Sequence, residues 1–241
     1  MNYVKSIKLR CMPDAASYLS ELPCIRYLSR LESLPFSEPV TFFVGENGTG
    51  KSTLIEAIAV AMGFNAEGGS RDHMFTTKNT CSELSELLTI IKTVPPKDGF
   101  FLRAESFYNT ATYLDEYSQL VRYGMKSFHK QSHGESFLAL IEHRFEGHGL
   151  YILDEPEAAL SPQKLLSLIP LIDLLVKQDS QFLIATHSPI LMAYPHAEIY
   201  QFSEKGIQSV AYRDTEHFQT TKMFLDNPER MIHYLLDEND E

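Results

Sequence analysis

The chain has 241 residues, of which 44% are hydrophobic, and this is enough apolar material for one sizeable core. Its 32 acidic and 21 basic residues give a formal net charge of −11, whereas a dedicated nucleic-acid binder usually shows a basic excess. No run approaches the roughly 18 apolar residues of a membrane span, and the first residues lack the apolar region of a signal peptide. Three cysteines without a C-x-x-C pair favour free thiols, so we expect a cytoplasmic protein without a membrane span.

Predicted strands and helices alternate along the first half of the chain, beginning with a strand over residues 3–9. Residues 39–44 form a short β-branched and aromatic run, which is typical of a buried strand, and apolar residues recur at helical spacing over 51–64. The polar segment 65–99 contains paired glycines and prolines, which predict short helices and loops. Residues 99–107 then predict a strand that ends in polar residues.

The second half also predicts helices and strands in alternation, and its first two strands are continuously apolar. Pro162 suits the first turn of one helix, and Pro170 inside that helix should introduce a kink. The expected elements are a helix over 135–145, a strand over 149–156, a helix over 162–178, a strand over 181–189, a hairpin through Gly206 and a short helix from Pro228 to Leu236.

Continuously apolar strands that alternate with helices indicate a mainly parallel sheet covered on both faces. In such sheets the ligand lies at the carboxyl ends of the strands. Polar residues follow the predicted strands at 45–52, 103–106, 154–155 and 187, so we expect one site at that edge of the sheet.

The segment GENGTGKST fits the pattern G-x-x-x-x-G-K-[ST] between a predicted strand and a predicted helix. Its glycines let backbone N–H groups wrap around phosphate oxygens, and the helix start adds positive potential. Lys51 can reach the β- and γ-phosphates, and Ser52 can bind Mg²⁺. A glycine-rich turn that happens to precede a helix is the alternative. The predicted nucleotide-binding residues are Gly45, Glu46, Asn47, Gly48, Thr49, Gly50, Lys51, Ser52 and Thr53.

Two acids and a histidine end the predicted strands that follow. Beside a phosphate loop, Asp154 suits holding Mg²⁺ and Glu155 suits polarising an attacking water. A neutral imidazole at His187 could hydrogen-bond the γ-phosphate or that water. Solvated acids in a turn and a histidine that caps a strand are the alternatives. We expect a surface position for Glu157 and no site role for the other eight histidines.

Ser132 and Glu135 form a capping box directly before a predicted helix. The segment lacks the G-x-S-x-G pattern and does not follow a strand, so we do not expect a catalytic serine on a nucleophile elbow. A helix start with Ser, Gly and Ser is also a ready anion site. Helix cap and anion site are therefore both open interpretations of this segment.

The ordered set GENGTGKST, SHGES, LYILDEPEAALSP and IATHS, over roughly residues 38–190, resembles the motifs of the ABC-type ATPases. The segment VTFFVGENGTGKSTLIEAIA is most similar to the SMC/RecF-type branch and to compact stand-alone bacterial ATPases near it. The resemblance implies one α/β P-loop domain over 1–241 with a mainly parallel RecA-like sheet. It also implies a small antiparallel N-terminal β part and a short helical lobe inserted at 65–135.

The resemblance further implies that two copies pair head to tail, so that each signature faces the ATP bound by its partner. Ser132, Gly134 and Ser136 would then contact the γ-phosphate in trans, and residues 158–161 would form the D-loop at the seam. The signature departs from the family pattern, because His133 replaces a glycine and Glu135 replaces a glutamine. Glu105 is the positional candidate for the missing Q-loop residue near Mg²⁺.

We therefore expect an ATP- and Mg²⁺-dependent ATPase that acts as a homodimer, with Glu155 as base and with Lys51 and His187 as further catalytic residues. The alternative is a nucleotide-gated binding module whose slow hydrolysis accompanies recruitment of an effector protein or DNA. A P-loop kinase would need an acceptor site and would not explain His187 or SHGES. The basic segment 122–133 could complement phosphates bound by a partner copy, touch DNA or remain solvated, and the net charge gives DNA binding no support.

Overall fold

The computed structural model describes residues 2–70, 83–107 and 133–237, and the structural statements that follow concern these ranges. Its strands are β1 (Val4–Leu9), β2 (Leu34–Pro35), β3 (Val40–Gly45), β4 (Leu88–Lys92), β5 (Asp98–Arg103), β6 (Gly149–Asp154), β7 (Gln181–Ala185), β8 (Glu198–Ser203) and β9 (Gly206–Ser209). Its helices are α1 (Pro23–Leu28), α2 (Lys51–Ala61), α3 (Leu84–Leu87), α6 (His133–Arg144), α7 (Pro162–Lys177), α8 (Pro189–Met192), α9 (Glu216–Asp226) and α10 (Pro228–Asp237).

The main sheet has the strand order β5-β6-β7-β3-β8-β9, in which β5 to β8 run parallel and β9 returns antiparallel to β8. This confirms the predicted, mainly parallel sheet. In the register of the sheet, Ala185 of β7 pairs with Phe43 of β3 on one side and with Asp154 of β6 on the other. The order therefore brings the ends of β6, β7 and β3 side by side, although β3 is far from β6 in the sequence.

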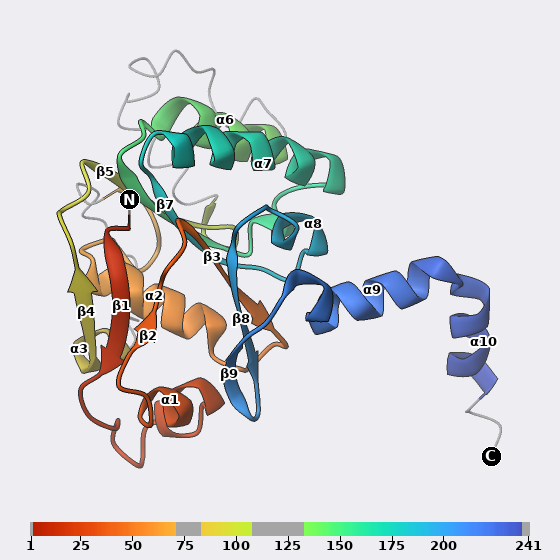
Figure 1. Ribbon diagram of the computed structural model, residues 1–241, viewed down its shortest axis with the longest axis horizontal. Coiled ribbons are helices and arrows are strands. Elements are labelled where there is room, and N and C mark those ends of the chain that lie inside the picture. The colour runs from red at the N-terminus through yellow and green to blue at the C-terminus, as the bar shows by residue number, and fades with distance from the viewer. Residues whose placement is uncertain (1, 71–82, 108–132, 238–241) are drawn as a thin grey trace.

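Two hydrophobic cores lie on opposite faces of this sheet, because successive strand residues point to opposite sides. Phe43 and Ile152 face the core that contains α2, whereas Phe42 and Tyr151 face the core built with α6 and α7. Figure 1 shows the pair α6–α7 on one side of the sheet and α2 on the other. Coverage on both faces explains why the strands are apolar without alternation.

A small antiparallel sheet of order β2-β1-β4 packs beside α2, as predicted for the N-terminal part. Its strand β4 was expected to be helix or loop, whereas β5 corresponds to the strand predicted over residues 99–107. In its described part, the segment 65–135 that was predicted as a helical lobe contains α3 and the start of α6 besides these two strands, and the lobe itself stays a prediction. The ranges 71–82 and 108–132 of the predicted lobe lie outside the described residues.

The C-terminal helices α9 and α10 extend away from the sheet (Figure 1). The helix expected from Pro228 is confirmed as α10, whereas α9 was not predicted. None of the residues of α9 is buried, so this helix does not bury an apolar face in either core. Among the described helices, none combines the length and the apolar character needed to cross a membrane.

Candidate active site

The glycine-rich loop after β3 ends at Gly50, which is the N-cap residue of α2 and has a left-handed φ of 95°. A Cβ atom at this position would lie 2.3 Å from the Cys24 sulfur, so both the backbone angle and the space require glycine. Lys51 follows as the first residue of α2 and is only 4% exposed. Its Nζ donates a hydrogen bond to the Glu46 carbonyl oxygen at 2.8 Å, across the mouth of the loop.

Burial lowers the pKa of Lys51, and the nearby carboxylates of Glu155 and Asp154 only partly oppose this effect. The charged form of a buried ammonium group is stabilised when further negative charge approaches it. The site therefore favours an anionic ligand at the place where the phosphate-loop pattern predicts one. The other predicted members are arranged along the loop, with Glu46, Asn47 and Gly48 exposed, Thr49 buried, and Ser52 and Thr53 on the first turn of α2.

Asp154 is the last residue of β6 and is 5% exposed. Burial raises its pKa to about 6, against the opposing effects of the Arg103 charge and the Ser52 hydroxyl. Arg103 ends the neighbouring strand β5, and its Nε lies 3.3 Å from Asp154 Oδ2. The other oxygen, Oδ1, is buried and has no hydrogen-bond partner within the described part of the chain.

A cavity of about 450 Å³ joins the predicted metal-binding residues. The unpartnered Asp154 Oδ1 and the Ser52 hydroxyl suit Mg²⁺, which prefers oxygen ligands and keeps several waters. Glu105 lies at the rim, with a side chain that is 88% exposed and an Oε2 3.6 Å from Arg103 Nη2. The lining residues are Ser52, Arg103, Ala104, Glu105, Asp154, Glu155, Ala158 and Ala159.

Glu155 adopts a left-handed backbone conformation with φ 51°, which is uncommon for a residue with a side chain. Its N–H donates to the Ala185 carbonyl at 2.9 Å, which fixes the turn against the end of β7. Its side chain is 40% exposed, and its Oε1 lies 3.6 Å from His187 Nε2. The turn thus places this carboxylate beside His187 at the carboxyl ends of β6 and β7, as a candidate base requires.

Glu157 does not occupy the solvated position that the sequence suggested. It accepts a hydrogen bond from the Thr186 hydroxyl at 2.8 Å and another from the His187 backbone N–H. Burial raises its pKa, and these hydrogen bonds oppose the rise. The side chain therefore holds the loop after β7 in place.

His217 also contradicts the expectation that the other histidines lie outside the site. Its Nε2 lies 2.9 Å from His187 Nδ1, and both rings are partly buried. Burial lowers the pKa of His187, as do the positive charges of Lys51 and His217, whereas Glu155 and Glu46 raise it. Burial also lowers the pKa of His217. Both rings are therefore held mainly neutral at pH 7.

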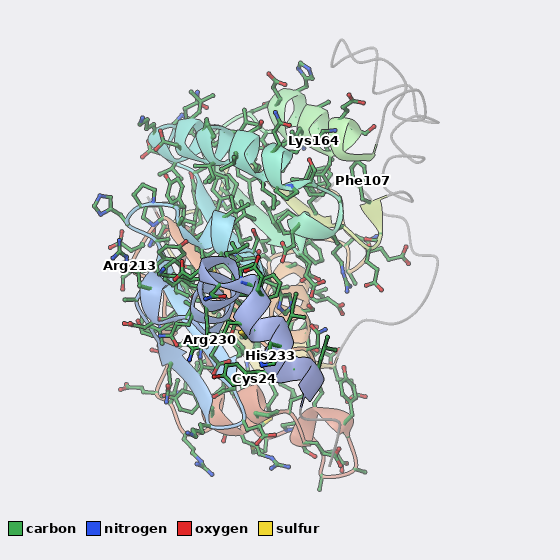
Figure 2. All side chains as sticks on the ribbon, turned by 90° about the vertical axis from the view of Figure 1, so that its right-hand side faces the viewer. Cys24, Phe107, Lys164, Arg213, Arg230 and His233 are labelled. Carbon is green, nitrogen blue, oxygen red and sulfur yellow. The ribbon has the colours of Figure 1, made fainter. Side chains whose placement is uncertain are left out.

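The predicted signature lies at the start of α6, beside the predicted D-loop. A Cβ atom at Gly134 would lie 3.0 Å from the Ala159 carbonyl oxygen and 2.9 Å from Lys164 Cδ. Lys164 belongs to the first turn of α7, and Figure 2 shows it next to α6. Ser136 is 2% exposed, whereas Glu135 is exposed.

Contacts of the signature with a partner's phosphate stay a prediction. Ser132 lies outside the described residues, so the capping box of Ser132 and Glu135 stays a prediction, and of His133 only the backbone is described.

Four site residues were missed from the sequence: Arg103, Glu56, Glu157 and His217. Arg103 bridges Asp154 and Glu56, whose Oε2 lies 2.7 Å from Arg103 Nη1. The polar cluster at 103–106 was a signal for Arg103, and Glu157 follows the acidic pair by two residues. His217 gave no signal, because α9 brings it to the site from a distant part of the chain.

Two segments of the chain match family models. Residues 24–101 match a model described as "AAA domain", and residues 135–193 match one described as "AAA domain, putative AbiEii toxin, Type IV TA system". The chain is 39% identical over 67 residues to the DNA repair protein RAD50 of Drosophila melanogaster. That match covers 27% of this chain and 5% of RAD50, so the chain spans a small part of that relative.

Solved structures resemble the fold at low identity. The cbiO1 protein from Clostridium perfringens, part of the ABC transporter complex cbiONQ, is 16% identical with a TM-score of 0.50, over 98% of this chain and 99% of that one. The SMC head domain from Thermotoga maritima is 16% identical with a TM-score of 0.48, over 87% of this chain and 99% of that one. The chain therefore has the fold of a P-loop ATPase, and two of its segments match AAA-domain models.

Proposed function

We propose that this chain hydrolyses ATP with Mg²⁺, as one half of a head-to-tail dimer. The observation that carries the proposal is the convergence of Lys51, Asp154, Glu155 and His187 at the ends of the adjacent strands β3, β6 and β7. Backbone N–H groups of the phosphate loop and the Lys51 ammonium would bind the phosphates. Ser52 and Asp154 would hold Mg²⁺, whose chemistry is to offset the charge of the phosphate oxygens.

Glu155 would take the proton of a water that attacks the γ-phosphorus, while the bond to the β–γ bridging oxygen breaks. Its position supports this role, because the carboxylate is partly exposed and lies 3.6 Å from the His187 ring. His187 would hydrogen-bond the γ-phosphate or the attacking water. Together with Lys51, it would stabilise the charge that develops in the transition state.

The dimer is proposed from the signature motif and from its place in the fold. Gly134 at the start of α6 packs against Ala159, which also lines the cavity of Asp154. A second copy would then bring its signature, Ser132 to Ser136, to the ATP bound by the first. In this arrangement the exposed Glu135 needs to face away from the γ-phosphate.

The test is Glu155→Gln in the full chain. Loss of a general base lowers turnover by about 10²–10⁴-fold, so hydrolysis should nearly vanish, while ATP binding persists and ATP traps a dimer. Phosphate release, nucleotide affinity and light scattering measure the three outcomes. Glu204→Gln, at an exposed acid between β8 and β9, is the control and should hydrolyse normally. Undiminished hydrolysis by Glu155→Gln would refute the assigned base.

The second candidate function is a nucleotide-gated binding module with slow hydrolysis. The observation that favours it is that α9 begins against His187 and carries, together with α10, exposed apolar side chains. Both helices extend away from the sheet (Figure 1). Nucleotide contacts of His187 at the start of α9 would thus change how α9 and α10 bind an effector protein. Fast steady-state turnover without any partner would argue against this candidate, and stimulation by added DNA would identify DNA as the partner.

A further inference from the structure

Two histidines from distant parts of the chain meet beside the candidate base. His187 follows β7, and His217 is the second residue of α9. The atoms His187 Nδ1 and His217 Nε2 are 2.9 Å apart, which is hydrogen-bond distance. The other nitrogen of His187, Nε2, faces Glu155 Oε1 at 3.6 Å. The His187 ring is therefore placed between a carboxylate and a second imidazole.

Only one proton can occupy the contact between the two neutral rings. If His187 Nδ1 carried it, His187 Nε2 would be a bare lone pair facing the Glu155 carboxylate, and two acceptors would oppose each other. If His217 Nε2 carries it, His187 Nδ1 accepts and His187 Nε2–H points at the carboxylate. The second arrangement is favoured by electrostatics, and burial of both rings favours the neutral forms that it requires.

We propose that His217 is a positioning residue for ATP hydrolysis: it donates a hydrogen bond to His187 Nδ1 and fixes His187 as the tautomer protonated at Nε2. In this tautomer His187 donates to the γ-phosphate or to the attacking water and cannot act as an acceptor there. The inference rests on the proposed function. It also means that the first turn of α9 belongs to the active site.

The start of α9 is anchored firmly enough for this role. Thr215, the N-cap residue, is fully buried; its hydroxyl donates to the Tyr212 carbonyl at 2.8 Å and accepts from the Phe218 N–H at 3.3 Å. The backbone N–H of Glu216 donates to Gln201 Oε1 of β8 at 3.2 Å. His217 is thus fixed to the main sheet, although none of the residues of α9 itself is buried.

The first experiment compares three substitutions at this position. His217→Ala should lower kcat for ATP by about 10–100-fold, with KM changed less than about twofold, as is typical when a group that orients a functional imidazole is lost. His217→Gln should restore much of the rate, because its amide can donate to His187 Nδ1. His217→Phe keeps a ring but lacks the donor, and should resemble His217→Ala. The control His143→Ala changes an exposed histidine of α6 and should be neutral.

The second experiment reads the tautomer directly. Nitrogen-15 NMR of the full chain should show His187 protonated at Nε2 alone, and His217→Ala should give a mixture of tautomers. In a His187→Ala background, His217→Ala should cost no further activity. Normal kcat of His217→Ala, failure of His217→Gln to restore the rate, or an unchanged tautomer would each overturn the inference. The NMR result does not depend on hydrolysis, so an inactive wild type would count against the proposed function alone.

Discussion

Glu157 fixes the backbone of His187, because its carboxylate accepts hydrogen bonds from the His187 N–H and from the Thr186 hydroxyl, the latter at 2.8 Å. The two residues come from the turns after β6 and β7, which are neighbours in the sheet. Glu157 therefore sets the position of the histidine relative to Glu155, whose N–H is bound to the same end of β7.

Glu157→Ala should lower kcat for ATP hydrolysis by about 10–100-fold, because a displacement near 1 Å of a catalytic group costs about that much. Loss of the acceptor also leaves the buried Thr186 hydroxyl and the His187 N–H without this partner, so stability should fall by about 1–3 kcal/mol. Steady-state kinetics and urea unfolding measure the two effects. Glu157→Gln retains an acceptor and should lose less of both, whereas normal activity of the alanine variant would contradict the positioning role.

Arg103 bridges the carboxylates of Asp154 and Glu56 and is itself largely buried. Arg103→Ala leaves both acids in place without their cation, so the free energy of unfolding should fall by about 3–5 kcal/mol. Urea unfolding at pH 7 measures the loss. Removal of this charge should also raise the pKa of Asp154 further, which weakens Mg²⁺ binding at neutral pH.

The control for Arg103 is Lys177→Ala, which breaks the exposed pair between Lys177 and Asp173 on α7. Solvent screens such pairs, so its loss should be much smaller than that of Arg103→Ala. Equal effects of the two substitutions would show that the Arg103 bridge contributes no more than a surface pair.

The main sheet was predictable because its strands are short, apolar on both faces and followed by polar residues at one edge. The phosphate loop, Asp154, Glu155 and His187 follow directly from that pattern, since parallel strands gather their carboxyl ends. Strand β4 was not predictable in this way, because only Leu88 of its residues is buried and its partner β1 lies some eighty residues earlier.

The roles of Glu157 and His217 depend on contacts that are distant in sequence. The spacing of Glu155 and Glu157 in the sequence does not show whether Glu157 is solvated or hydrogen-bonds the loop after β7. For His217, the decisive fact is that Thr215 anchors α9 at the main sheet, which is a matter of tertiary packing. Local patterns therefore predicted residues at strand ends and missed those that reach the same site from elsewhere.

Asp98 provides a test of pH dependence away from the phosphate loop. Its carboxylate accepts hydrogen bonds from Arg144 Nη1 at 2.8 Å, the Tyr151 hydroxyl at 2.7 Å and the Glu146 N–H at 3.1 Å. Burial alone would raise its pKa, but the Arg144 charge and these hydrogen bonds outweigh burial and lower it. The folded state therefore binds the Asp98 proton more weakly than the unfolded state does.

Because the folded pKa is depressed, Asp98 stabilises the protein above the unfolded pKa of about 3.9, and this contribution is lost as pH falls through the folded value. Asp98→Asn should thus lower the free energy of unfolding by about 1.5–3 kcal/mol at pH 7, where the carboxylate makes charged hydrogen bonds. The difference between variant and wild type should shrink below about pH 4, as urea unfolding over a pH series can measure. Asp173→Asn, at the exposed pair with Lys177, should show a smaller difference throughout. A gap between wild type and Asp98→Asn that stays constant from pH 7 to pH 3 would mean that the Asp98 charge does not stabilise the β5–β6 edge of the sheet.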